Sequence, residues 1–319
     1  AWQRWRSGSG PVGQGLWKPV GSRELGLGRD PVGFWNAAVI AGIEMGGTKT
    51  VVAVGERDGT VLEEYRYPTT DGEGTFREAV EWLRERGQPE AFGVGAFGPV
   101  SVSKDRSDYG RMLPTPKPGW AGFSITGALE AAFAGVRVAL ETDVNAAVLA
   151  EAGDLRNLAY ITIGTGIGGG VMCEGRLVHG ALHTELGHIR VPRAEGDDFA
   201  GLCPFHGDCL EGLASGPAMA ERWGVEAKDL PSGHQAWDFE AHYLAMAAQA
   251  LLAIASPERL VIGGGVSQAE GFHALVEEKL RVAAGGYFPP LEDASPFVVP
   301  PKYGQQAGIR GALMLTREL

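Results

Sequence analysis

The chain has 319 residues, enough for one large domain or two of ordinary size, and 44% of them are hydrophobic, which supports a sizeable core. A net charge of −11 argues against a nucleic-acid partner, because phosphate binding needs a basic surface. No apolar run is long enough to span a membrane, and three cysteines, too few for a disulfide framework, favour a reducing, cytoplasmic location.

Residues 1–37 differ in composition from everything that follows. They are rich in Gly, Trp and Arg, show no periodicity and carry a net charge of +3, which leaves −14 for the remainder. A secretory signal would need a continuous apolar stretch, which this segment lacks, and a transit peptide is a weaker alternative. We expect a non-native or disordered leader, or a wrongly assigned start, and exclude the segment from the fold.

The next segment begins with a meander of three strands. Residues 37–45 read as a buried strand, and a glycine turn leads from it into two further strands, 50–56 and 61–68. The spacing of the apolar residues predicts a helix over 74–86, and 91–100 reads as a strand followed by a loop.

This first unit closes with two helices around one more strand. A helix is predicted over 123–134, with Ser124 as its N-cap. Residues 136–143 read as a strand that ends in acids, and a helix over 144–153 starts directly after it.

The same order then starts again. Residues 158–175 read as a strand, a glycine turn and a second strand, and 259–267 as a later strand running into a turn. Four helices are expected in this half, at 210–223, 239–255, 269–282 and 307–317. The apolar face of the second of these helices is predicted to run through Tyr243, Ala247, Ala250, Leu251 and Ile254. Two consecutive units of this kind predict a duplicated α/β fold with a cleft between its halves.

Glycine turns follow three of the predicted strands. The first is Gly46, Gly47, Thr48 and Lys49, the second is Gly164, Thr165 and Gly166, and the third contains Gly264 and Gly265. Backbone N–H groups of such turns can approach a phosphate because no Cβ is in the way. An ordinary hairpin explains any one turn, but two equivalent turns in two similar units favour a nucleotide held between them.

Asp143 ends a predicted strand, at the edge where open α/β sheets bind their ligands. A carboxylate there can accept the proton of an attacking hydroxyl, as general bases do in phosphoryl transfer. The equally weighted alternative is that Asp143 caps the following helix. Asn145 is either a helix residue or a second polar contact.

The stretch from Glu185 to Glu211 predicts a metal site. The spacing of its ligand-type residues fits a closed tetrahedral zinc set of His188, Cys203, His206 and Cys209. Four protein ligands leave no open position, so the metal would be structural. Glu185 and Glu211 are candidates for sugar hydroxyls because the metal would hold their loop.

The remaining cysteine and four of the remaining histidines lack such neighbours in the sequence. We expect a buried structural thiol at Cys173. The histidines, read as surface or core residues, are His179, His183, His234 and His242.

Several motifs occur in the order found in the ROK family of sugar kinases and related repressors, which residues 38–317 resemble. These motifs are GGTK (46–49), TDVNAA (142–147), IGTGIGGG (163–170), ELGH (185–188) and GGGV (263–266). Within the family the chain looks most like the bacterial fructokinases, because Glu44 stands where most members carry Asp, TPKPGW (115–120) follows a Tyr–Gly pair, and the cysteine knuckle contains His206.

The resemblance implies a two-lobed, actin-like (ribonuclease H-like) ATPase fold with a structural zinc loop. The lobes would span 38–150 and 151–304, with a C-terminal helix, 305–319, returning to the first lobe. It implies ATP-dependent phosphorylation of a hexose, fructose to fructose 6-phosphate, with Mg²⁺ on the nucleotide, in a cytoplasmic homodimer.

Site roles carry over by position. Asp143 would be the catalytic base, and the first two glycine turns would hold phosphates. Gly264 and Gly265 would lie near the adenosine. The residues implied to border or face the sugar are Gly98, Pro99, Glu185, His188 and Glu211, so that His188 would serve both the sugar and the zinc.

Two departures from the pattern concern the sugar and the metal. Ser101–Val102 follows the Gly–Pro–Val loop where an Asp–Leu pair is expected, and Glu44 is one methylene longer than Asp. One alternative is the same chemistry on mannose, glucose or an N-acetylhexosamine. A second is a sugar-sensing repressor without catalysis, which would need a DNA-binding helix-turn-helix that residues 1–37 are too short to supply.

Overall fold

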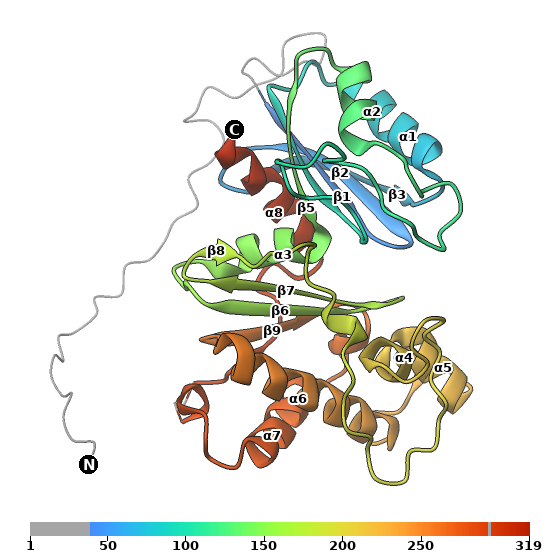
Figure 1. Ribbon diagram of the computed structural model, residues 1–319, viewed down its shortest axis with the longest axis vertical. Coiled ribbons are helices and arrows are strands. Elements are labelled where there is room, and N and C mark those ends of the chain that lie inside the picture. The colour runs from blue at the N-terminus through green and yellow to red at the C-terminus, as the bar shows by residue number, and fades with distance from the viewer. Residues whose placement is uncertain (1–38, 293–294) are drawn as a thin grey trace, which may run out of the picture.

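The computed structural model describes residues 39–292 and 295–319, so the expected leader lies outside the described residues. Two five-stranded sheets stack one above the other, with two helices between them (Figure 1). In the described part of the chain, no helix is long and apolar enough to cross a membrane.

The first sheet has the strand order β3-β2-β1-β4-β5. Its antiparallel meander consists of β1 (Ile40–Met45), β2 (Lys49–Gly55) and β3 (Val61–Pro68), as predicted. Two parallel strands, β4 (Ala91–Ala96) and β5 (Arg137–Thr142), extend the sheet from β1.

The second sheet repeats this arrangement in the order β8-β7-β6-β9-β10. Its antiparallel part is formed by β6 (Leu158–Ile163), β7 (Ile167–Cys173) and β8 (Arg176–Leu177). Its parallel part is formed by β9 (Arg259–Gly263) and β10 (Val298–Val299). The predicted duplication of one α/β unit is therefore confirmed.

Each sheet is covered on its outer face by its own helices. The first carries α1 (Gly72–Arg84) and α2 (Ile125–Ala132), and the second carries α6 (Ala236–Ala255) and α7 (Phe272–Ala284). Asp71 and Ser124 cap α1 and α2 by accepting hydrogen bonds from backbone N–H groups, and the second of these caps was predicted.

The inner faces of the two sheets bury α3 (Asp143–Ala152) and α8 (Ala307–Leu315) between them. Successive side chains of β6 point to opposite faces of the second sheet. Ile161 therefore faces α6 and α7 on the outer face, whereas Tyr160 faces α3 on the inner face. On the other side, α8 packs on β1 and β4 of the first sheet. Strand ends of both sheets thus meet around one helix pair.

Several helix predictions differ from the structure in detail. The expected helix over 210–223 is two helices, α4 (Leu210–Ala214) and α5 (Gly216–Trp223). Ser215 separates them because it is extended and its hydroxyl caps α5, while the Gly–Pro pair after it starts a new helix. The helix expected from residue 269 begins at Phe272, after Gly271 with a φ of 75°.

The predicted apolar face of α6 and the predicted burial of Cys173 also need correction. Tyr243, Ala247 and Leu251 are buried, but Ile254 is 85% exposed, although Leu252 and Ala255 of the same last turn pack on the core. Cys173, at the end of β7, is half-buried and not fully enclosed.

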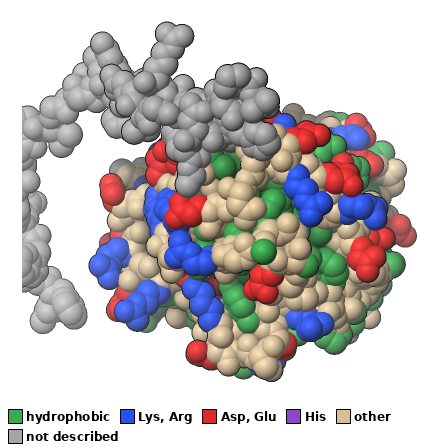
Figure 2. Space-filling view, turned by 90° about the horizontal axis from the view of Figure 1, so that it is seen from above, with side chains coloured by type: hydrophobic (Ala, Val, Ile, Leu, Met, Phe, Trp, Pro, Cys, Tyr) green, Lys and Arg blue, Asp and Glu red, His purple; other side chains and the backbone are tan. Residues whose placement is uncertain are grey.

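On the face of the molecule shown in Figure 2, acidic and basic side chains lie side by side.

Candidate active site

Asp143 is the first residue of α3 and follows β5 directly. The helix cap is Thr142, whose hydroxyl accepts a hydrogen bond from the Asn145 N–H at 3.2 Å. The alternative that Asp143 serves as the cap is therefore wrong. Burial raises the pKa of Asp143 to about 6, and the charge of Glu185 adds to the rise, while the Val144 N–H at 2.9 Å opposes it.

Asp143 shares a cavity between the two sheets with Glu44 of β1. Glu44 Oε2 is buried and has no hydrogen-bond partner among the described residues. Burial, followed by the charge of Asp143, raises the pKa of Glu44 to about 7. A Cβ at Gly308 of α8 would lie 2.5 Å from Glu44 Cδ, so a glycine is needed there to admit this carboxylate.

The first two glycine turns are open to solvent. In the β1–β2 turn Gly47, Thr48 and Lys49 are exposed, and the Lys49 ammonium lies 3.5 Å from Gln305 Oε1. In the β6–β7 turn the Gly164 N–H donates to the Gly166 carbonyl at 2.9 Å. A Cβ at Gly47 or Gly164 would have no neighbour within 4 Å, so a ligand can approach the backbone closely at both turns.

The third glycine turn follows β9. Gly264 has a φ of +92°, and a Cβ there would lie 2.2 Å from the Ile163 carbonyl oxygen, so only glycine fits. A second cavity of about 490 Å³ adjoins that of Asp143, because Gly264, Gly304 and Gln305 line both. Pro300 and Pro301 form part of its wall, and the sequence reasoning did not anticipate this segment.

Gly98 and Pro99, joined by a cis peptide bond, follow β4 and approach Glu185. The structure adds His183, which was read as a surface or core residue and is buried. Its Nε2 accepts a hydrogen bond from the Val100 N–H at 3.2 Å, and its Nδ1 lies 3.5 Å from Glu185 Oε1. The spacing of histidines at 179, 183 and 188 was the available signal, but nothing in it indicates which chain segment lies opposite.

His179, also read as a surface or core residue, is exposed and adds a contact with the end of β5. Its Nε2 lies 2.5 Å from Glu141 Oε1, at the end of β5 and two residues before Asp143. The other carboxylate oxygen of Glu141 accepts from the Asn145 amide at 2.8 Å and from the Thr142 N–H at 3.0 Å. Asn145 is thus a buried polar contact that braces the turn carrying Asp143.

Glu211 lies in the first turn of α4, close to the second glycine turn. Its Oε2 accepts a hydrogen bond from the Ile167 N–H at 3.0 Å and would lie 2.5 Å from a Cβ at Gly166. The Glu211 charge also raises the pKa of Glu185, after the larger effect of burial. Glu211 therefore lies between the turn and the Glu185 side of the cleft.

Ser101, at the position where the resemblance leads one to expect Asp, does not face the cleft. It is buried, and its hydroxyl donates to Asp108 Oδ1 at 2.7 Å. Arg106 binds both oxygens of the same carboxylate, at 2.8 and 2.9 Å. The serine at this position stabilises the loop that follows the Gly98–Pro99 turn.

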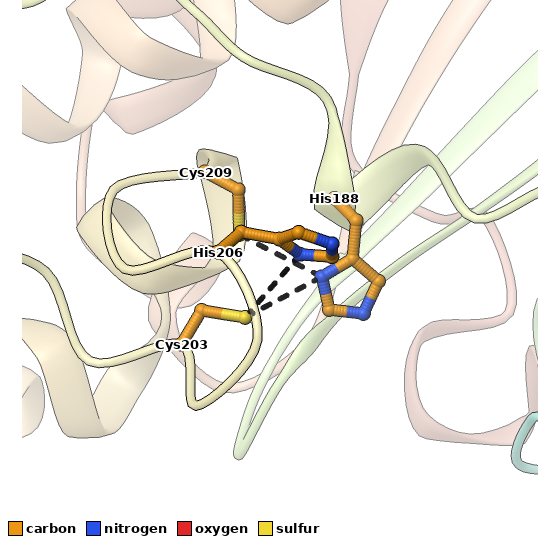
Figure 3. A group of neighbouring side chains, drawn as sticks. All are labelled: His188, Cys203, His206 and Cys209. Carbon is orange, nitrogen blue, oxygen red and sulfur yellow. Dashed lines mark hydrogen bonds between the residues drawn. The ribbon is translucent and has the colours of Figure 1, made fainter.

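The four predicted zinc ligands converge (Figure 3). Their candidate ligand atoms all lie within 4.8 Å of one another. His188 Nδ1 lies 3.7 Å from Cys203 Sγ and 3.6 Å from Cys209 Sγ, and His206 Nδ1 lies 3.6 Å from Cys203 Sγ. Zn–S and Zn–N bonds of about 2.3 and 2.0–2.1 Å at tetrahedral angles separate S from N by about 3.5–3.6 Å, so the residues fit zinc.

Residues 40–319 match the model of the ROK family. A fructokinase of Zymomonas mobilis subsp. mobilis is 38% identical over 287 residues, which cover 86% of this chain and 94% of that protein. A fructokinase of Pediococcus pentosaceus is 37% identical over 286 residues, covering 88% and 98%. The crystal structure of a ROK hexokinase from Thermus thermophilus superposes with a TM-score of 0.68 at 30% identity, over 87% of this chain and 97% of that one.

Proposed function

This chain belongs to the ROK family, and from that premise we propose that it is an ATP-dependent hexose kinase that converts D-fructose and ATP to D-fructose 6-phosphate and ADP. The observation that carries the proposal is the half-buried carboxylate of Asp143, which does not cap α3 and lies in a cavity between two sheets whose glycine turns are open. Fructokinases that match over most of their length support the choice of sugar.

In the proposed reaction Asp143 accepts the proton of the sugar hydroxyl. The hydroxyl oxygen then forms a bond to the γ-phosphorus of ATP as the bond to the β–γ bridging oxygen breaks, and ADP leaves with that electron pair. A pKa of about 6 leaves the Asp143 carboxylate ionised at neutral pH yet basic enough to bind the proton as it is released.

We assign the nucleotide to the open glycine turns and to the second cavity. The phosphates would contact Gly46, Gly47, Thr48, Gly164, Thr165 and Gly166, with Lys49 close by. Gly264 and Gly265 would border the adenosine, opposite the wall formed by Pro300 and Pro301. Glu44 would face Mg²⁺, because its buried Oε2 lacks a partner within the described chain. When bound, Mg²⁺ would neutralise charge on the phosphates.

We assign the sugar to the Glu185 side of the cleft, bordered by Gly98 and Pro99. Glu211 and His188 would complete this wall. The zinc site would be structural: His188, Cys203, His206 and Cys209 would close a tetrahedron and leave no coordination position for a substrate.

We propose that the first lobe spans residues 38–150 and the second spans residues 151–304, and that the helix over 305–319 returns to the first lobe. We also propose that the protein is a homodimer.

The experiment that tests the proposal is a panel of hexoses assayed with ATP and Mg²⁺. We expect kcat/KM for fructose to exceed that for glucose, mannose and N-acetylmannosamine. If glucose or mannose ranked well above fructose, the kinase assignment would stand and the sugar assignment would be wrong. The second candidate is therefore the same chemistry on another hexose, which the solved ROK hexokinase supports.

A further inference from the structure

A short segment of the second lobe reaches across to the strand ends of the first. We call Val178–Glu185 the histidine strap, because His179 and His183 pair within it through an isolated β-bridge. The strap is fixed to β7, since the Val178 N–H donates to the Val171 carbonyl at 2.8 Å and the Thr184 hydroxyl donates to the Gly169 carbonyl at 2.9 Å.

The chain immediately after the strap packs just as closely on β7. A Cβ at Gly187 would lie 1.9 Å from the Ile167 carbonyl oxygen, and one at Gly169 would lie 2.4 Å from the Leu186 side chain. The strap therefore moves with the second sheet, and whatever it contacts in the first lobe is held relative to that sheet.

His183 makes the strap's contact with the loop after β4. Its side chain is 2% exposed, and its Nε2 accepts a hydrogen bond from the Val100 N–H across 83 residues of sequence. Because Nε2 must accept, the proton of the neutral ring is assigned to Nδ1, which lies 3.2 Å from the Thr184 carbonyl oxygen. Burial lowers the pKa of His183, which favours this neutral acceptor form.

The same ring lies against the Gly98–Pro99 turn. A Cβ at Gly98 would lie 2.9 Å from His183 Cε1 and 3.2 Å from Glu185 Oε1. The imidazole therefore touches both parts of the proposed sugar wall, the turn from the first lobe and the carboxylate from the second. His179 holds the other end of the strap to the first lobe, through its contact with Glu141.

We propose that His183 is a positioning residue of the sugar site, whose neutral imidazole ties the Gly98–Val100 turn to the Glu185 segment and so sets the affinity for the hexose. The inference rests on the proposed function, because it takes these two segments as the walls of the sugar site. It adds a role for a residue that needs no contact with the reacting atoms.

Two substitutions separate this role from a general effect on folding. His183→Leu fills similar space but leaves the buried Val100 N–H unpaired, which typically costs about 1–3 kcal/mol and corresponds to a roughly 5- to 150-fold weaker site. His183→Gln can place an amide oxygen near the position of Nε2 and restore the acceptor. His242→Leu, in α6, is the matched control: the His242 Nε2 lies 3.0 Å from the Pro192 carbonyl oxygen and its ring packs edge-on against Tyr243, so neither contact involves the proposed sugar wall.

The measurements are KM for the sugar, KM for ATP, kcat and the melting temperature of each variant, with the hexose that the wild type prefers. We expect His183→Leu to raise the sugar KM at least about 5-fold, with a much smaller change in kcat and ATP KM. His183→Gln should recover most of the sugar KM, and His242→Leu should resemble the wild type.

Three outcomes would overturn the inference. They are an unchanged sugar KM in His183→Leu, a His183→Gln variant as impaired as His183→Leu, or equal losses in sugar KM, ATP KM and kcat. If His183→Leu does not fold, the comparison of His183→Gln with the wild type decides, because a sugar KM raised more than about 5-fold there would contradict the acceptor role. A wild type that phosphorylates no hexose would instead overturn the proposed function, and this inference with it.

Discussion

At the scale of single residues, the chemistry of the cleft depends on two carboxylates that burial makes less acidic. Asp143 and Glu44 share one cavity, and the charge on Asp143 also raises the pKa of Glu44. Two carboxylates that share one cavity favour a bound cation, and the repulsion between their charges destabilises the folded chain when no cation is present.

Replacing Asp143 by Asn should abolish most turnover while leaving the fold intact. A general base typically contributes about 10²–10⁴-fold to the rate, so we expect kcat to fall by at least about 100-fold with a much smaller change in sugar KM. Steady-state kinetics on the preferred hexose provide the measurement. Near-normal kcat in the variant would show that another group takes the proton.

The pH dependence follows from the same group. Because Asp143 must be ionised to accept a proton, kcat/KM should rise with pH up to about 6 and then level off. The free energy of unfolding changes in the opposite direction. The pKa of the Asp143 carboxyl is raised from 3.8 to about 6, so the folded chain binds the proton more tightly than the unfolded chain does. Stability is therefore lost as the pH rises from about 4 to above 6. Asp143→Asn should therefore melt at a higher temperature than the wild type at pH 7–8, and this advantage should disappear near pH 4.

At the scale of elements, the proposed zinc loop connects two parts of the proposed sugar wall. His188 ends the short helix that follows Glu185, and Cys209 directly precedes α4, which begins with Leu210 and Glu211. A metal that holds both ligands also fixes the separation of the two glutamates. Its removal should weaken sugar binding more than ATP binding.

Cys203→Ser is expected to lose zinc and stability together. We expect about one zinc per chain in the wild type, much less in the variant, and a melting temperature lower by several degrees, since each kcal/mol shifts it by about 2–4 °C in a domain of this size. Metal analysis and calorimetry measure both effects. The third cysteine provides the control: Cys173→Ser, outside the cluster, should keep its zinc. Full zinc occupancy in Cys203→Ser would refute the ligand set.

Local patterns in the sequence predicted the elements well because their causes are local. The meander, the Ser124 cap and the knuckle spacing each depend on neighbours within a few residues. The division of the segment after Leu210 into two helices was missed because an apolar helical pattern outweighed the Ser–Gly–Pro signal at 215–217. The contacts of His179 and His183 could not be predicted, since their partners lie 38 and 83 residues away along the chain.

At the scale of the whole molecule, the cleft exists because α3 and α8 hold the two sheets together. Neighbouring backbone packs directly against both helices, at positions where only glycine leaves enough room. A Cβ at Gly93 of β4 would lie 1.7 Å from the Ala312 carbonyl oxygen of α8, and one at Gly311 of α8 would lie 1.7 Å from the Ala146 carbonyl oxygen of α3. The backbone of α8 therefore contacts the first sheet on one side and the helix that begins with Asp143 on the other.

Gly311→Ala tests this arrangement, because intrinsic preference and packing predict opposite results. Inside a helix alanine is favoured over glycine by about 1 kcal/mol, so a stabilised variant is expected if α8 has room. The Ala146 carbonyl is backbone and cannot rotate away, so we expect a net loss of about 1–3 kcal/mol, a lower melting temperature and a lower kcat as α3 shifts with Asp143. Gly233→Ala is the control: that residue is exposed and a Cβ there would have no neighbour within 4 Å, so its stability should stay within about 0.5 kcal/mol of the wild type. Equal stability of Gly311→Ala and the wild type would mean that α3 and α8 can move apart at little energetic cost. Contacts other than the one between α3 and α8 would then have to fix the position of one sheet relative to the other.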